Sequence, residues 1–325
     1  MEKQNDLEPM RVFVGTDDSQ TVATKVLEHS IKKFASRPVE VVYMRDLDVP
    51  MPKDKKNRPR TGFSFYRFMI PQLAGYKGRA LYVDADMQVF TDLSELWQIP
   101  FGDQKVLCTS QPEPPPAWRN NSFFKAGRQF SVMLLDCSRL DWDIREIVKD
   151  LDDDKFTYPQ LMFDLCVVRP DEIADRIPPE WNHLEQYSPG VTKLIHYTVV
   201  PTQPWKANKN PLASVWIRCF AEAVQEGVVT RADIESGVAN KHLDPMLLEF
   251  LALSPESRGS AASKEDLLTT LKAQVIDGTT KLYQVRQELS KMSKDIEGMS
   301  TSSAWKIGQA MTKPFELFRR ASPAR

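Results

Sequence analysis

Two aspartates separated by one residue, Asp84 and Asp86, are the pair whose type and spacing could do the most chemistry in this chain. They end an apolar run at residues 79–83, after which the chain turns apolar again. Side chains alternate along a strand with period two, so both carboxylates are expected to point the same way from its end. Two like charges in a partly dry cleft repel each other unless one is protonated or a cation lies between them. The pair therefore predicts a site for a hard divalent ion, and the alternative is an acidic turn after an edge strand.

The elements that must position this pair alternate between strand and helix. Residues 12–15 predict a strand that runs into a polar segment, 16–19, which can cap a helix. The apolar face of that helix consists of Val22, Val26, Leu27, Ile31 and Phe34. Further strands are expected at 39–44, 106–109 and 130–135, a helical segment around 64–73, and a short apolar helix at 246–253. Such alternation predicts an α/β fold with a mostly parallel sheet covered by helices and ligands at the carboxyl ends of the strands.

The composition is that of a globular protein whose net charge does not favour any class of charged partner. The chain has 325 residues, of which 42% are hydrophobic and 27% charged, and its formal net charge is -1. This size can bury one large core and carry an appendage. A net charge near zero offers no general attraction to polyanions, so no nucleic-acid partner is expected.

The cysteines and the apolar segments bear on the expected location. Cys108, Cys137, Cys166 and Cys219 are far apart and form no C-x-x-C pair. Each lies in or beside an apolar run and is expected to be a small buried hydrophobe in a reducing compartment. Residues 1–10 are polar and acidic rather than signal-like, and no apolar stretch is long enough to span a bilayer. A cytoplasmic location is therefore expected.

Five ordered segments resemble the family 8 glycosyltransferases. These are Val14-Gly15-Thr16-Asp17-Asp18, the segment 65–73, Tyr82-Val83-Asp84-Ala85-Asp86 followed by 92–97, Trp181-Asn182, and Leu194-Ile195-His196-Tyr197 leading to Pro204-Trp205. The resemblance covers residues 11–206 and extends to enzymes of bacterial polysaccharide and lipopolysaccharide synthesis. It implies a GT-A fold, a Rossmann-like sheet that binds a nucleotide-diphospho-sugar. It also implies retaining transfer of a sugar, usually from a UDP-sugar, with Mn²⁺ or Mg²⁺ as the cofactor.

The same resemblance implies roles for individual residues. Asp84 and Asp86 would hold the metal, with His196 as the third protein ligand, and the metal would neutralise charge on the leaving diphosphate. The alternative for His196 is a histidine at the edge of the core, hydrogen-bonded to backbone. The donor nucleotide and sugar would be bound by Thr16, Asp17, Asp18, Arg67, Asp84, Ala85, Asp86 and Lys206.

Three positions depart from the family pattern. Ser131 lies where the family often has Asn-Ala-Gly, and Pro159-Gln160-Leu161 keeps only the glutamine of Asp-Gln-Asp. Gln203 replaces the lysine that usually precedes Pro-Trp, so Lys206 would supply that charge. Gln160 and Arg67 are the expected catalytic residues. The alternatives are a helix start for Gln160 and a surface cation for Arg67.

The composition changes after the expected catalytic region. We expect a transferase domain at 1–253, a linker at 254–264, a coiled-coil-like helix at 265–300 and a basic amphipathic tail at 301–325. The seam of the helix, interrupted at Gly278, consists of Leu268, Leu271, Val275, Leu282, Val285, Leu289, Met292, Ile296 and Met299. It predicts a homo-oligomer, and the alternative is a helix that docks on its own domain. The tail, with Trp305 among basic residues, predicts peripheral contact with the inner face of a membrane; the alternative is a frayed terminus.

The acceptor and two other functional classes remain open at this stage. A glycan or lipid-linked acceptor is expected, and the candidate acceptor loop is 112–125, which contains Trp118, Phe123 and Phe124. A haloacid-dehalogenase-like phosphatase also places Asp-x-Asp after a strand, but it requires Thr or Val where this chain has Gln88. The other alternative is a non-catalytic scaffold that keeps a decayed donor site.

Overall fold

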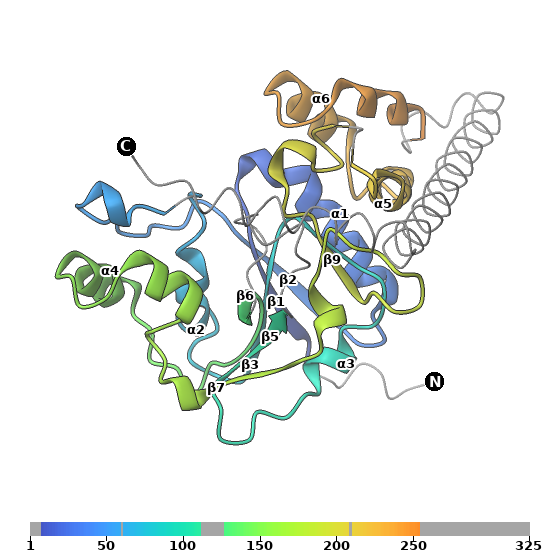
Figure 1. Cartoon of the computed structure of the whole chain (residues 1–325). Helices are drawn as coiled ribbons and strands as arrows, with labels where there is room; N and C mark the ends of the chain where they lie inside the picture. The colour runs from blue at the N-terminus through green and yellow to red at the C-terminus, as the bar shows by residue number, and fades with distance from the viewer. Residues whose placement is uncertain (1–7, 60, 112–126, 208–209, 254–325) are drawn as a thin grey trace, which may run out of the picture. The chain divides into compact units, whose positions relative to one another are not determined.

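A six-stranded sheet in the order β2-β1-β3-β6-β5-β7 lies at the centre of the structure (Figure 1). The computed structural model describes residues 8–59, 61–111, 127–207 and 210–253. The chain divides into two units, Met1–Lys264 and Glu265–Arg325, and all described residues lie in the first. The expected acceptor loop, linker, coiled-coil seam and basic tail lie outside the described residues, so they stay predictions.

Five strands of the sheet run in one direction and one runs in the other. Their bounds are β1 Met10–Gly15, β2 Val39–Met44, β3 Arg79–Asp84, β5 Val106–Gln111, β6 Gly127–Asp136 and β7 Ile173–Ile177. β1 pairs in parallel with β2 and β3, whereas β6 is antiparallel to both β3 and β5. The α/β class with a mostly parallel sheet flanked by helices, expected from the sequence, is confirmed. The register of β1 on β3 sets Gly15 opposite Asp84, so the polar residues after β1 lie beside the aspartate pair.

Alternating side chains of the central strands build two separate cores. Phe13, Tyr82 and Met133 pack into one core with α2 (Ile70–Leu73) and α4 (Ile144–Asp152). The neighbouring residues Val12, Val14, Leu81, Val83, Val132 and Leu134 pack into the other with α1 (Thr21–Phe34) and α3 (Ser94–Trp97). A strand buried on both faces must be apolar at nearly every position, which is why β3 reads as a continuous apolar run.

Two further helices cover the outside of α1. α5 (Ala213–Gln225) and α6 (Arg231–Ala239) both contact α1, and the 3₁₀ segment Pro245–Leu253 contacts both of them. The aromatic side chains of Trp205, Trp216, Phe220 and Phe250 form a chain of ring contacts through this layer. The apolar helix expected at 246–253 is therefore present, in 3₁₀ rather than α form.

A second, three-stranded sheet adjoins the end of β3. It consists of β4 (Met87–Val89), β9 (Leu194–His196) and β8 (His183–Leu184), in the order β4-β9-β8. Only two residues separate the end of β3 from the start of β4, so the Asp-x-Asp segment is the corner between the two sheets. The Val89 amide donates to Ser30 Oγ on α1 at 3.1 Å, which anchors this corner to the helix layer.

The expectation for the cysteines is correct at three positions and wrong at one. Cys108, Cys137 and Cys219 are buried, whereas Cys166 is exposed. Cys166 follows Leu165, which adopts a left-handed backbone conformation at the end of a short helical turn, and this reversal turns the thiol outward. Among the described helices, none combines the length and apolar character needed to cross a membrane.

Candidate metal and donor site

Three ligand atoms from two sheets meet at the corner between them. Asp84 is the last residue of β3, Asp86 follows two residues later, and His196 is the last residue of β9. His196 Nε2 lies 3.1 Å from Asp86 Oδ1 and 3.9 Å from Asp84 Oδ2, and the three side chains offer ligand atoms within 4.8 Å of one another. The three predicted metal ligands are therefore brought together by the fold.

Strand pairing is what brings His196 to the aspartates. β4 and β9 are antiparallel, with Met87 opposite His196, and the Tyr197 amide donates to the Asp86 carbonyl at 2.8 Å. His196 is only 8% exposed, so it cannot swing away from this position without opening the small sheet.

The outer oxygen of each aspartate is occupied by a neighbouring side chain. The Tyr82 hydroxyl donates to Asp84 Oδ1, and Arg67 Nη2 lies 3.6 Å from the same oxygen. Gln203 Nε2 donates to Asp86 Oδ2 at 3.0 Å. Each carboxylate is thus held by one oxygen and presents the other toward His196.

The outer nitrogen of His196 is held in the same way. Nδ1 lies 3.2 Å from Asn182 Oδ1, while Asn182 Nδ2 donates to Ser131 Oγ at 3.0 Å and to Thr109 Oγ1 at 3.3 Å. Since the amide oxygen can only accept, Nδ1 carries a hydrogen, and the second hydrogen, on Nε2, is the one that a metal ion would displace to use the Nε2 lone pair. Such second hydrogen bonds to a metal-binding histidine fix its tautomer and orientation.

The charges at this corner are adjusted by burial and by one another. Burial raises the pKa of Asp84 above its usual value, with Asp86 adding to the shift and Arg67 and His196 opposing it. Burial alone would lower the pKa of His196, but the charges of Asp86 and Asp84 and the hydrogen bond to Asp86 raise it overall. A positive charge at the position of Nε2 therefore stabilises the ionised form of both carboxylates. Two carboxylate oxygens and one imidazole nitrogen form a donor set that fits Mn²⁺.

Arg67 lies beneath the aspartates instead of on a helix surface, which was the alternative for it. It is 9% exposed, its guanidinium stacks over the Tyr82 ring at 4.7 Å, and Nη1 donates to the Phe130 carbonyl at 3.0 Å. Nη2 donates to the Tyr82 hydroxyl at 3.1 Å. Burial would lower its pKa, yet Tyr82 and Asp84 raise it, so the residue supplies a permanent buried charge behind Asp84.

The expected base and ribose residues follow β1 and are engaged locally. Thr16 is buried, with Oγ1 at 2.7 Å from Thr24 Oγ1 of α1. Asp17 Oδ1 accepts from the Ser19 amide at 2.9 Å and caps the turn before α1. Asp18 is exposed, and its Oδ1 lies 3.9 Å from Arg45 Nη1. The Ala85 amide donates to the Gly15 carbonyl at 3.2 Å, which joins this segment to the aspartate corner.

The described contacts of Gln160 and Lys206 are with residues other than the three predicted metal ligands. Gln160 begins a short π-helical turn, and its Oε1 accepts from the Thr157 amide at 2.8 Å and from Thr157 Oγ1 at 2.9 Å. This is the helix-start role that was its alternative. Lys206 follows buried Trp205, and its amide donates to the Gln203 carbonyl at 2.8 Å.

Residues 5–137 match the model described as Glycosyl transferase family 8. This segment is similar to family 8 sequences. The match runs from β1 through β6 and includes Asp84 and Asp86, so the resemblance inferred from the sequence is confirmed over these residues. His196 lies beyond the match, and its place beside the aspartates comes from the geometry.

The chain is also similar to individual proteins over part of their length. Protein CDI of Arabidopsis thaliana is 32% identical over 111 residues, which are 33% of this chain and 43% of that protein. The WbbM bifunctional glycosyltransferase has a TM-score of 0.49 at 15% identity, covering 72% of this chain and 52% of that one. The galactosyltransferase LgtC, in complex with donor and acceptor sugar analogs, has a TM-score of 0.46 at 12% identity, covering 66% and 96%. The chain thus spans about half or less of the length of Protein CDI and WbbM.

The sequence alone does not indicate a supporting role for four residues at this corner. They are Gly15, Tyr82, Asn182 and Gln203. Tyr82 had a usable signal, because it lies two residues before Asp84 on the same face of a strand. Gly15 is explained by Tyr82: a Cβ at residue 15 would lie 2.7 Å from the tyrosine hydroxyl. Gln203 lies 117 residues from Asp86, and no local pattern indicates that contact.

Proposed function

We propose that this chain transfers a sugar from a nucleotide-diphospho-sugar, with a UDP-sugar as the donor, to an acceptor hydroxyl with retention of configuration. One observation carries the proposal. Asp84 Oδ2, Asp86 Oδ1 and His196 Nε2 face one another, while the second polar atom of each side chain is held by a separate neighbour. Polar atoms arranged in this way form a preorganised cation site, and the family match supplies the reaction class.

The donor chemistry of this site suits Mn²⁺, or Mg²⁺ in its place. When bound by Asp84, Asp86 and His196, the ion would neutralise the charge that develops on the leaving diphosphate. Arg67 and Tyr82 keep Asp84 in one orientation, and Gln203 does the same for Asp86. Each ligand is therefore in position before the donor arrives, which avoids reorganisation during the reaction.

The remaining donor and catalytic assignments are proposals of the same kind. Thr16, Asp17 and Asp18 would lie near the base and ribose, because they follow β1 beside the aspartate corner. Lys206 would supply a cation near the diphosphate, since Gln203 carries no charge. Gln160 remains the proposed polar residue at the reacting sugar, and Gln160→Ala should then lower kcat with little change in metal requirement. A glycan or lipid-linked acceptor at the inner face of a membrane completes the proposal.

The test is nucleotide release from a panel of sugar nucleotides with Mn²⁺, using the full chain. We expect release with a UDP-sugar, and a loss of roughly a hundredfold or more in Asp86→Asn, because removing one charged ligand weakens stabilisation of the transition state by about 3 kcal/mol or more. The matched control is Asp141→Asn, an exposed aspartate that should leave turnover unchanged. Full activity of Asp86→Asn, or activity in excess chelator, would sink the metal-dependent mechanism.

The same assay separates the two other functional classes. A phosphatase would release inorganic phosphate from a phosphomonoester without a sugar nucleotide. A scaffold would bind Mn²⁺ without turnover, and the replacement of the usual lysine by Gln203 is the observation that favours it. Metal binding measured by calorimetry, in parallel with turnover, distinguishes an inactive scaffold from an active transferase.

A further inference from the structure

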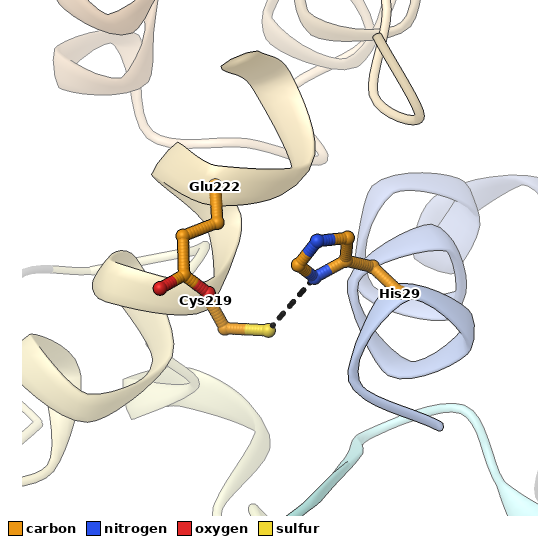
Figure 2. Close-up of side chains that lie close together, drawn as sticks. All are labelled: His29, Cys219 and Glu222. Carbon is orange, nitrogen blue, oxygen red and sulfur yellow. Dashed lines mark hydrogen bonds between the residues drawn. The ribbon is translucent and has the colours of Figure 1, made fainter. Parts of the chain in front are cut away.

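A second group of metal-binding side chains lies between α1 and α5, on elements other than those that carry Asp84, Asp86 and His196. It consists of His29 on α1 with Cys219 and Glu222 on α5, and its ligand atoms lie within 4.8 Å of one another. Figure 2 shows the Cys219 thiol pointing at the His29 ring, with Glu222 on the same helix. Cys219 and Glu222 are three residues apart, which puts both on one face of α5.

The separation of the sulfur and nitrogen atoms matches that of ligands on one zinc ion. His29 Nδ1 lies 3.5 Å from Cys219 Sγ. Zinc binds thiolate sulfur at about 2.3 Å and imidazole nitrogen at about 2.0–2.1 Å in a tetrahedral arrangement, which puts the two ligand atoms about 3.5 Å apart. The two side chains are therefore spaced for a shared ion before one arrives.

The other nitrogen of His29 has the partner that metal-binding histidines usually have. His29 Nε2 lies 3.2 Å from Glu226 Oε2, at the carboxyl end of α5. A carboxylate on the far nitrogen fixes the tautomer with its hydrogen on Nε2, so the lone pair of Nδ1 is directed to the thiol. His29 is 4% exposed, while the Glu226 side chain is 64% exposed and that of Glu222 is 35% exposed. The buried ligand His29 is thus next to two glutamates whose side chains reach solvent.

Negative charge gathers here with little to offset it. Burial raises the pKa of the Cys219 thiol to about 12, and Glu222 and Glu226 add to that shift while Lys33 opposes it. Lys33 Nζ pairs with Glu222 Oε2 at 2.6 Å and so offsets one of the two glutamate charges. Without an ion, the thiol has two weak acceptors among the described residues, His29 Nδ1 at 3.5 Å and the Val26 carbonyl at 3.7 Å. A divalent cation would reverse the balance, because it favours the thiolate that the glutamates disfavour.

We propose that His29 Nδ1, Cys219 Sγ and a carboxylate oxygen of Glu222 bind a Zn²⁺ ion that ties α1 to α5, with water as the fourth ligand. On binding, the Cys219 S–H bond breaks, its proton leaves to solvent, and an S–Zn bond forms. Thiolate and imidazole select zinc over manganese, so this site differs in metal from the carboxylate-rich corner at Asp84 and Asp86. The ion would join α1, which covers the sheet, to the layer of α5 and α6.

The test uses Co²⁺ as a spectroscopic stand-in for Zn²⁺, with the full chain after chelation and dialysis. We expect one equivalent of Co²⁺ to produce an intense near-ultraviolet charge-transfer band, which reports a thiolate ligand and cannot arise from Asp84, Asp86 and His196. Zn²⁺ should then displace the Co²⁺ and abolish the band. Cys219→Ala should lack the band, while Cys137→Ala, which removes another buried thiol, and Asp86→Asn should keep it.

Two milder substitutions test the zinc site even if Cys219→Ala folds poorly. Glu222→Gln changes a partly exposed ligand, and Glu226→Gln changes the partner of His29. Each should weaken Zn²⁺ binding tenfold to a hundredfold, with the metal-free Tm close to that of the parent chain. An unchanged zinc affinity in both variants, or a Co²⁺ complex of the parent chain without the thiolate band, would overturn the proposal. Nucleotide release by Asp86→Asn does not enter this test, so the two proposals can fail separately.

Discussion

The chemistry of the aspartate corner depends on side chains that do not themselves face the proposed ion. Tyr82, Gln203 and Asn182 each bind the outward atom of one ligand, and together they leave Asp84 Oδ2, Asp86 Oδ1 and His196 Nε2 for the cation. Partners of this kind are worth about tenfold to a hundredfold in metal affinity or activity. We therefore expect Gln203 to act as a positioning residue, although it replaces a charged residue of the family pattern.

Replacing Gln203 tests this role. Gln203→Leu leaves Asp86 Oδ2 without its donor, so we expect the Mn²⁺ concentration for half-maximal nucleotide release to rise about tenfold to a hundredfold. Gln203→Glu should raise it further, because it puts a like charge beside Asp86. Gln72→Ala, an exposed glutamine on α2, is the control. A metal titration that is the same for all three variants would remove Gln203 from the site.

The close packing of Gly15 on Tyr82 supports a second test. A Cβ at residue 15 would lie 2.7 Å from the Tyr82 hydroxyl and 3.3 Å from the Phe63 ring, and the hydroxyl is held by Arg67 and Asp84. Gly15→Ala should cost about 1–3 kcal/mol of unfolding free energy by overpacking.

Removing the hydroxyl should relieve part of that cost. Tyr82→Phe alone leaves buried Arg67 short of a partner and is expected to lose about 1–3 kcal/mol. The double variant should lose less unfolding free energy than the two single variants lose together, because the alanine Cβ no longer contacts the hydroxyl. Denaturant unfolding of the four proteins measures the coupling, and strict additivity would show that the two residues do not interact.

Among the elements, α6 is held to α1 by charge as well as by packing. Thr230 and Asp233 form a reciprocal capping box at its amino terminus, and Lys25 Nζ of α1 lies 2.5 Å from Asp233 Oδ2. Burial would raise the pKa of Asp233, but the hydrogen bonds from Lys25 and Thr230 lower it below its usual 3.8. The ionised form is therefore favoured in the folded protein.

This contact makes the stability of the layer depend on pH. A group whose pKa is lowered by folding contributes stability above its unfolded pKa and loses it as pH falls through the folded pKa. Asp233→Asn should thus cost about 1 kcal/mol near pH 7 and progressively less below pH 3.8. Thermal unfolding of both proteins across this range measures the difference. Glu235→Gln, which breaks an exposed pair with Arg231, should cost less than Asp233→Asn near pH 7.

At the level of the molecule, the proposed transferase site lies in the described residues, and the expected oligomer and membrane contacts belong to residues 254–325. The alternating apolar seam from Leu268 to Met299 and the basic aromatic tail are sequence patterns outside the described residues. If the seam associates chains, each assembly presents several tails. One tail binds a membrane weakly, but linked copies bind more tightly through effective concentration.

Deleting residues 303–325 should release the protein from anionic vesicles and leave transfer to a soluble acceptor intact. Changing Leu282 and Leu289 to Asp should lower the oligomer mass and also weaken vesicle binding at least tenfold, because the tails are then presented singly. Co-sedimentation with vesicles in low salt and sedimentation velocity measure the two effects. A full-length monomer at micromolar concentration would mean that the seam packs on its own domain.

Patterns local in the chain were enough to predict the sheet and the aspartate pair. The apolar run before Asp84, the alternation of strand and helix and the polar residues after residue 15 follow from side-chain period and capping, which act over a few residues. The metal role of Asp84, Asp86 and His196 was also predicted, although His196 came from the resemblance to family 8. The helix cap at Asp17 was predicted from residue type alone.

Contacts between distant segments could be known only once the chain was folded. Asp86 meets Gln203 across 117 residues, and His29 meets Cys219 across 190, in each case because separate strands or helices pack together. Nothing in the spacing of these residues encodes the meeting, since it depends on the register of β4 on β9 and on the packing of α5 on α1. The sequence thus contained the ligands of both proposed metal sites, whereas the fold determined which atoms of those ligands face one another.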